Sequence, residues 1–185
     1  MSRLFDRALL ERIESLGTQA ITRTVWRVTW TARDPLLGSG GGRWAPIEGP
    51  EVLYCSCEHN GALAEVYHHL SKAPIFSSSD KLICELNVRT RSTLDLTSES
   101  AREHLGVNRE ALLSRDPQRT QQIGAAACFL ECDSLLVPSA RWDCSNLVLF
   151  ADRILPQDGV ELRASTNVNW AAWKEQPEVA ARLRK

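Results

Sequence analysis

The sequence lacks a long apolar run, a large net charge and an abundance of aromatic side chains. Its 185 residues include one Met, two Tyr and four Phe, and the formal net charge is −1. No apolar stretch approaches the length of a transmembrane helix. Without an excess of basic residues there is no general positive field to attract nucleic acid or an anionic membrane. We therefore expect a protein that binds neither of them directly.

Paired metal-binding motifs are also missing. The six cysteines stand at positions 55, 57, 84, 128, 132 and 144, and none forms a C-x-x-C pair. His68 and His69 are adjacent, but no second cluster of ligands accompanies them. Reduced thiols that pack as small hydrophobic groups are the simplest interpretation, with a metal site or disulfides as the alternatives. We expect no metal cofactor.

The remaining composition is ordinary for one cytoplasmic domain. Hydrophobic residues make up 43% of the chain and charged residues 24%, which is typical of globular proteins. A chain of this length can bury one sizeable core but is short for two. Residues 1–16 alternate charged and apolar side chains, without the uninterrupted apolar segment of a signal peptide. We expect residues 1–185 to form a single domain in the cytoplasm.

Apolar periodicity predicts an α+β domain with a mixed β-sheet at its core. Strands are predicted at residues 22–31, 52–57, 81–88, 134–138, 146–150 and 160–164. Helices are predicted at residues 3–16, 61–70, 99–105, 108–114, 120–132 and 177–184, with Asn60 as the cap of the second. Small residues in the helix at 120–132 indicate close packing against the sheet.

Two arginines flank a glycine-rich loop. Arg27 lies within the first predicted strand, and Arg43 follows Gly40-Gly41-Gly42. The glycines allow the backbone to approach a ligand closely, and a guanidinium can bind two phosphate oxygens at once. The loop is neither a P-loop nor a dinucleotide-binding turn. Taken alone, Arg27 also fits a surface or ion-paired arginine, so this pattern indicates an anion without identifying it.

Three more polar side chains stand in apolar surroundings. Tyr54 ends a short apolar strand, Glu65 lies in a mostly apolar helical segment, and Ser139 follows an apolar run. A carboxylate in such surroundings needs a partner, for which an arginine is suitable. Each residue alone also fits an ordinary role, as a rim aromatic, a solvated helix residue or a turn residue. We expect them to meet Arg27 and Arg43 in one pocket.

The motifs taken together resemble the RES domain family, named for its Arg, Glu and Ser residues. The resemblance extends from about Thr24 to Ile154. It rests on Trp26-Arg27-Val28, Gly41-Gly42-Arg43-Trp44, Leu53-Tyr54-Cys55-Ser56, Ala62-Leu63-Ala64-Glu65, Leu94-Asp95-Leu96, Thr120-Gln121-Gln122-Ile123-Gly124, Pro138-Ser139-Ala140 and Asn146-Leu147-Val148-Leu149-Phe150. The order and the spacing match as well as the residues. One departure is Ala45, where the family typically has Asn.

The resemblance implies a fold related to the ADP-ribosyltransferase toxins. It implies a motif core at about 24–154, preceded by the helix at 3–16 and followed by an extension at 155–185. It also implies a toxin that consumes NAD+, paired with an antitoxin whose Xre-like helix-turn-helix region covers the active-site entrance. Close relatives cleave NAD+ with water or inorganic phosphate as acceptor, and some ADP-ribosylate a protein instead.

The chemistry of this class suits the candidate residues. Breaking the nicotinamide–ribose bond develops oxocarbenium character at the ribose, which a carboxylate such as Glu65 can stabilise. Arg27 and Arg43 would clamp the pyrophosphate, and Tyr54 would pack against the nicotinamide or its ribose. Ser139 would orient that ribose or the acceptor. The expected catalytic residues are thus Glu65, Arg43 and Ser139, and all five side chains would bind NAD+.

Three hypotheses remain open at this point. The first is an enzyme that destroys NAD+, and the second is an enzyme that transfers ADP-ribose to a protein. The third is a weakly active domain that mainly binds its antitoxin and acts in repression of their operon. A ribonuclease is disfavoured because the chain has no basic excess and its histidines do not form a pair from separate elements.

Overall fold

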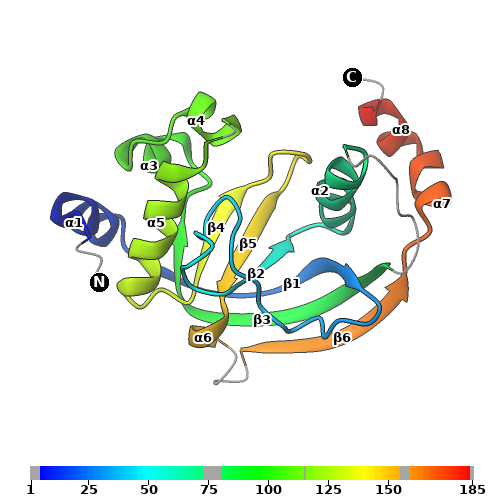
Figure 1. Cartoon of the computed structure of the whole chain (residues 1–185), viewed down its shortest axis with the longest axis horizontal. Coiled ribbons are helices and arrows are strands. Elements are labelled where there is room, and N and C mark those ends of the chain that lie inside the picture. Colours follow the sequence, from blue (N-terminus) through cyan, green and yellow to red (C-terminus); the bar gives the residue numbers. More distant parts are fainter. Residues whose placement is uncertain (1–4, 73–80, 115, 155–158, 184–185) are drawn as a thin grey trace.

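The computed structural model describes residues 5–72, 81–114, 116–154 and 159–183. The helices are α1 (Arg7–Leu16), α2 (His59–Leu70), α3 (Glu99–His104), α4 (Arg109–Leu113), α5 (Gln118–Phe129), α6 (Ala151–Ile154), α7 (Trp170–Glu175) and α8 (Pro177–Leu183) (Figure 1). The strands are β1 (Gln19–Trp30), β2 (Val52–Ser56), β3 (Lys81–Asp95), β4 (Ser134–Pro138), β5 (Ser145–Phe150) and β6 (Val160–Asn167). The chain is thus a mixed α+β domain, as predicted.

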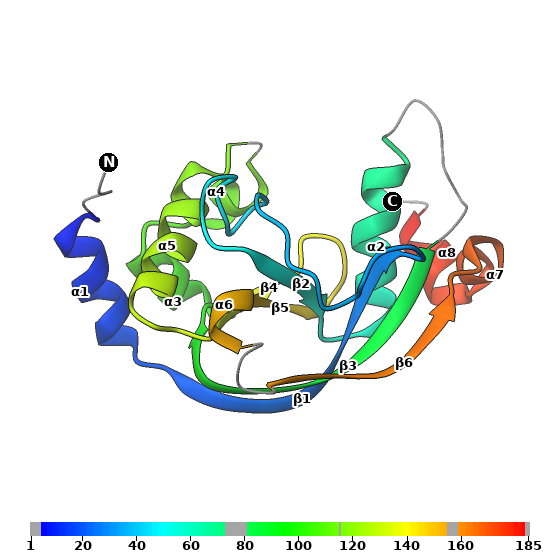
Figure 2. The same cartoon turned by 60° about the horizontal axis from the view of Figure 1, so that its bottom comes forward.

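The strands form one mixed sheet whose pairing closes on itself. Neighbouring strands follow the order β1-β2-β5-β4-β3-β6, and β1 pairs with β3 as well. Every pair is antiparallel except β3 with β4. The long strand β3 pairs with β6 over 82–88 and with β4 over 93–95. Because β3 also follows β1 along most of its length, β6 lies at an outer edge, as Figure 2 shows.

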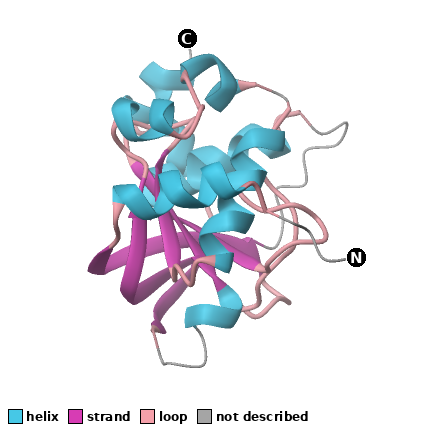
Figure 3. Ribbon diagram, turned by 90° about the vertical axis from the view of Figure 1, so that its left-hand side faces the viewer, coloured by secondary structure: helices cyan, strands magenta, loops and turns pink. Residues whose placement is uncertain are grey.

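Two groups of helices flank the central strands β2, β4 and β5 (Figure 1). One group contains α1, α3, α4 and α5, and its apolar core includes Ile123, Leu135 and Phe150. The other contains α2, α7 and α8, with Leu63 and Trp173 in its core. Figure 3 shows most of the helices gathered on one side of the strands. Burial of each apolar cluster therefore fixes one helical group to the sheet.

Helix α5 holds the loop that carries the glycines, here named the glycine loop (residues 38–44). A Cβ on Gly124 of α5 would collide with the Trp44 carbonyl group, so only glycine permits this close contact. The Thr120 hydroxyl donates a hydrogen bond to the Arg43 carbonyl, and the Gln121 amide donates to the Gly42 carbonyl at 2.8 Å. The predicted close packing of this helix is present, but its most intimate contact is with the loop.

Several element boundaries differ from the prediction. β3 continues to Asp95 instead of ending at 88, because residues 89–93 still pair with β1 and residues 93–95 gain β4 as a partner. β6 continues to Asn167. The helices α6 and α7 were not predicted, because each has only two buried apolar residues, too few to show a helical periodicity. α1 begins at Arg7, where the Asp6 carboxylate caps the Ala8 N–H.

The predicted cap at Asn60 is wrong. α2 begins at His59, so Asn60 lies inside the first turn. Its side chain accepts a hydrogen bond from the Trp173 indole at 3.1 Å and donates one to Glu178 at 2.6 Å. The position of Asn60 therefore depends on tertiary contacts with α7 and α8 and not on capping of the helix.

The predicted ends at residues 3–4, 155–158 and 184–185 lie outside the described residues. No helix within the described ranges is long and apolar enough to cross a membrane.

Candidate functional site

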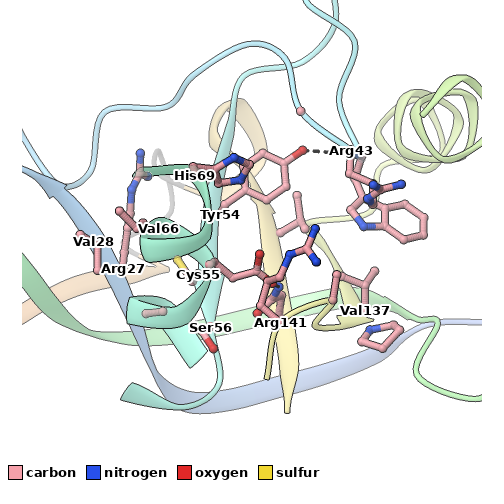
Figure 4. A pocket seen from close by; sticks show the side chains of 18 of the residues that line it. Arg27, Val28, Arg43, Tyr54, Cys55, Ser56, Val66, His69, Val137 and Arg141 are labelled. Carbon is pink, nitrogen blue, oxygen red and sulfur yellow. Dashed lines mark hydrogen bonds between the residues drawn. The ribbon is translucent and has the colours of Figure 1, made fainter. Parts of the chain in front are cut away.

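A cavity of about 500 Å³ opens between α2, the glycine loop and the ends of β2, β4 and β5. Four of the five predicted site residues line it, namely Arg27, Arg43, Tyr54 and Glu65. The first three are labelled in Figure 4. Ser139 does not line the cavity itself, although both of its neighbours in the chain do. It lies behind Glu65 and contacts the carboxylate directly. The structure thus brings together five residues that span more than a hundred positions of the sequence.

Glu65 is held by two side-chain hydrogen bonds from separate elements. The Ser139 hydroxyl donates to Glu65 Oε1 at 2.7 Å, and Asn146 Nδ2 donates to the same oxygen at 3.0 Å. Within the described chain no hydrogen bond reaches Oε2. The carboxylate is half-buried on α2. One oxygen therefore fixes its orientation while the other is free to interact with a ligand.

The hydrogen-bonding capacity of Ser139 is used by the protein. Its Oγ atom accepts backbone N–H groups from Arg141 at 3.1 Å and Trp142 at 3.2 Å, while its proton goes to Glu65. Its own N–H donates to the Cys144 carbonyl at 2.9 Å. These bonds close the loop between β4 and β5, here named the β4–β5 loop (residues 139–144). A hydroxyl with one proton and two lone pairs is saturated by such partners, so Ser139 can orient Glu65.

Arg27 is only 8% exposed and extends from β1 toward the cavity. Its Nη2 donates to the Leu37 carbonyl at 3.0 Å, whereas Nη1 is buried with no protein partner in the described chain. Burial is the main cause that lowers the pKa of Arg27, and the nearby Arg33 adds to the effect. A guanidinium nevertheless remains protonated in proteins. A buried donor without a partner indicates a position where a ligand oxygen can bind.

Arg43 repeats this arrangement on the opposite wall. Its Nη2 donates to the Ser114 carbonyl at 2.9 Å, and its Nη1 is also buried without a partner among the described residues. The backbone carbonyl of Arg43 is bonded to α5, as described above. Both arginines therefore have one end anchored and one donor unused.

Tyr54 connects β2 to the glycine loop. Its hydroxyl oxygen accepts the Trp44 N–H at 3.0 Å, the bond drawn in Figure 4. Gly42 has a φ of 129° and lies so close to the Tyr54 ring that a Cβ atom would collide with it. Burial is the main cause that raises the pKa of Tyr54. The residue is thus a neutral phenol that sets the shape of the loop next to Arg43.

Three residues that sequence reasoning did not assign to the site also belong to it. Asn146 binds Glu65, and Arg141 and His69 line the cavity. Asn146 is a polar residue at the start of an apolar strand, and His69 lies on the same helical face as Glu65. These two features of the sequence indicate a site role weakly. No feature of the sequence indicates a site role for Arg141, because an arginine in a polar loop is usually solvated. The cavity thus contains three arginines and one glutamate, a local positive charge in a nearly neutral protein.

Cys55 lines the cavity (Figure 4), but neither it nor the other cysteines have the properties of a reactive thiol. All six are free thiols, and burial is the main cause that raises the pKa of each, for Cys55 to about 12 and for Cys57 to about 11. A raised pKa means little thiolate at neutral pH and low reactivity. This agrees with the predicted structural role of the thiols.

Comparison with known proteins places the whole arrangement in one family. The RES domain model matches residues 24–177, which include every site residue above. The chain belongs to the RES domain family. The NAD(+) phosphorylase MbcT of Mycobacterium tuberculosis, and the same protein of Mycobacterium bovis, are 29% identical over 95% of this chain and 98% of the relative. A second M. tuberculosis protein, Rv3189, is 36% identical over 63% of this chain and 56% of its own length.

The fold of this RES domain also has a solved counterpart. The crystal structure of the M. tuberculosis MbcT–MbcA toxin–antitoxin complex matches it with a TM-score of 0.84. The match is 29% identical in sequence and covers 92% of this chain and 97% of the other. The sheet and the two helical groups therefore follow the architecture of the chain matched in that complex.

Proposed function

We propose that this RES domain is a toxin that depletes NAD+ by cleaving the nicotinamide–ribose bond, with inorganic phosphate or water as the acceptor. One observation carries the proposal: an oriented carboxylate shares a cavity of about 500 Å³ with two arginines, each of which has a buried, unused Nη1 donor. NAD+ carries an anionic pyrophosphate and a ribose that becomes cationic during cleavage, so it needs both groups. The similarity to MbcT, an NAD(+) phosphorylase, supports the same substrate.

The reaction follows from the properties of these residues. The bond from the ribose to the nicotinamide nitrogen breaks, and nicotinamide leaves as a neutral molecule with the electron pair. Glu65 stabilises the oxocarbenium character left on the ribose. An oxygen of water or phosphate forms the new bond at the same carbon, and a proton passes to solvent. Because the leaving group needs no proton, no general acid is required.

The other residues bind and orient the substrate. The unused Nη1 donors of Arg27 and Arg43 bind the pyrophosphate by charge-assisted hydrogen bonds. Tyr54 packs against the nicotinamide or its ribose and fixes the glycine loop. Ser139 acts through Glu65, since its hydroxyl is saturated by protein partners. We further propose that residues 1–185 act as a single cytoplasmic domain.

The proposed partner is an antitoxin with an Xre-like helix-turn-helix region that covers the cavity entrance. The similarity to the toxin chain of the MbcT–MbcA complex supports an antitoxin partner. A bound protein over the entrance would exclude NAD+ and so prevent depletion. This blockage is testable by adding the antitoxin encoded beside the toxin to the enzyme assay.

The decisive experiment mixes the purified chain with NAD+, with and without inorganic phosphate, and measures NAD+ and nicotinamide. Loss only with phosphate indicates a phosphorylase, and loss in both indicates a hydrolase. Arg43→Ala should abolish the loss and the growth inhibition while the protein stays folded. Label transferred from NAD+ to a protein would favour ADP-ribosylation instead. Tight antitoxin binding without either reaction would favour a binding role.

A further inference from the structure

Arg141 differs from the other two arginines of the cavity. It lies on the β4–β5 loop, and Figure 4 shows its side chain directed into the cavity. Arg27 and Arg43 each donate to a backbone carbonyl. The Arg141 guanidinium, by contrast, forms no hydrogen bond or ion pair within the part of the chain that the structure describes. It is exposed and has all of its donors available for a ligand.

The backbone of Arg141 is nevertheless linked to Glu65 by hydrogen bonds through Ser139. Its N–H donates at 3.1 Å to the Ser139 hydroxyl, which itself donates to Glu65. One short chain of hydrogen bonds thus sets the distance between the carboxylate and the base of the Arg141 side chain. The charge of Arg141 also reaches helix α2, because after partial desolvation it is the next cause that lowers the pKa of His68.

Phosphate as an acceptor poses an electrostatic problem that this arrangement solves. A phosphate anion must approach the ribose on which Glu65 acts, and two like charges so close together repel each other. Arg27 and Arg43 are already required for the pyrophosphate. A third cation in the same cavity offsets the repulsion and can offer two parallel donors to the phosphate. Water, being neutral, needs no such partner.

We propose that Arg141 binds the inorganic phosphate acceptor and selects phosphate over water. This inference rests on the function proposed above. A phosphate oxygen forms a bond to the ribose carbon as the bond to nicotinamide breaks, and nicotinamide leaves with the electron pair. The products are nicotinamide and ADP-ribose phosphorylated at that carbon, and the phosphate proton passes to solvent. Arg141 contributes charge and orientation and forms no covalent bond.

The test compares Arg141→Gln with wild type over a range of phosphate concentrations at saturating NAD+. We expect the KM for phosphate to rise at least about tenfold, because one charge-assisted contact is lost. The KM for NAD+ should change far less, and the product ratio should shift toward ADP-ribose formed with water. Arg163→Gln, at an exposed arginine of β6, is the matched control and should keep the wild-type KM for phosphate.

Three outcomes decide the inference. An unchanged KM for phosphate in Arg141→Gln would overturn it. A rise in the KM for NAD+ as large as that for phosphate would also overturn it, since Arg141 would then bind the dinucleotide. If wild type consumes no NAD+ at all, the proposed function fails. In that case the thermal stabilisation produced by inorganic phosphate is the readout: its loss in Arg141→Gln supports the inference and its persistence contradicts it.

Discussion

Replacing Glu65 by Gln separates the charge of this residue from its structural role. Glutamine has nearly the same size, and its amide oxygen can still accept the hydrogen bonds from Ser139 and Asn146. The substitution removes the negative charge that faces the ribose. Glu65→Gln should therefore leave the fold and the β4–β5 loop intact while it removes the stabilisation of the oxocarbenium ion.

The size of the effect can be bounded from the burial of the carboxylate. A ribose in contact with Glu65 would place the two charges roughly 4 Å apart, where an effective dielectric constant of about 20 gives about 4 kcal/mol. In bulk water the same pair would be worth about 1 kcal/mol. Glu65 is half-buried and hydrogen-bonded, so we expect a value toward the upper figure. The corresponding loss in rate is about 10³-fold.

The assay is the initial rate of nicotinamide release at saturating NAD+ and phosphate, with thermal unfolding as the test of folding. Glu175→Gln, at an exposed glutamate of α7, is the matched control and should keep the wild-type rate. A folded Glu65→Gln protein with a rate within about fivefold of wild type would refute the electrostatic argument, because about 1 kcal/mol is what a fully solvated pair would lose.

Three further substitutions test the supports of the site. Tyr54→Phe leaves the Trp44 N–H without its acceptor, so denaturant titration should show a loss of about 1 kcal/mol and kcat/KM for NAD+ should fall. Gly124→Ala forces α5 away from the Trp44 carbonyl; the expected loss of about 1–3 kcal/mol would show as a lower Tm. Burial raises the pKa of Cys55 to about 12 in the folded protein. Above pH 9 this thiol therefore ionises in the unfolded state only, and the free energy of unfolding falls between pH 9 and 12. In Cys55→Ala that fall should be shallower by up to about 1.4 kcal/mol per pH unit, as urea unfolding at pH 8, 9 and 10 would reveal.

The sequence predicts a strand correctly where the residues of the strand and the turns beside it define its ends. The strands β2, β4 and β5 lie within one residue of their predicted bounds, because each is a short apolar run bounded by polar turns. The second half of β3 was missed for the opposite reason. Its pairing partners are the start of β1, about seventy residues earlier, and β4, about forty residues later, and no feature of the strand itself indicates either of them.

The site residues also divide into those that local motifs predict and those that depend on contacts between distant parts of the chain. The five predicted residues do converge around one cavity, because motifs that match a family carry information about tertiary structure. Asn146 was missed since its contact with Glu65 joins residues 81 positions apart. Ala45 was noted as a departure, and the structure gives it a physical setting: it is 0% exposed within an apolar cluster. An Asn side chain there would bury an amide that needs partners.

The arginines and the glutamate of the cavity are held in place by different means, and this difference matches their proposed tasks. The guanidinium groups of Arg27 and Arg43 are each anchored by a backbone carbonyl and each have a buried Nη1, which suits groups that bind the same anion in every turnover. Glu65 is oriented by side chains from β5 and the β4–β5 loop, so its position depends on Ser139 and Asn146. A change in that loop can therefore alter the acceptor, through Arg141, without disturbing pyrophosphate binding. Relatives that differ in their acceptor should accordingly differ more in this loop than around Arg27 and Arg43.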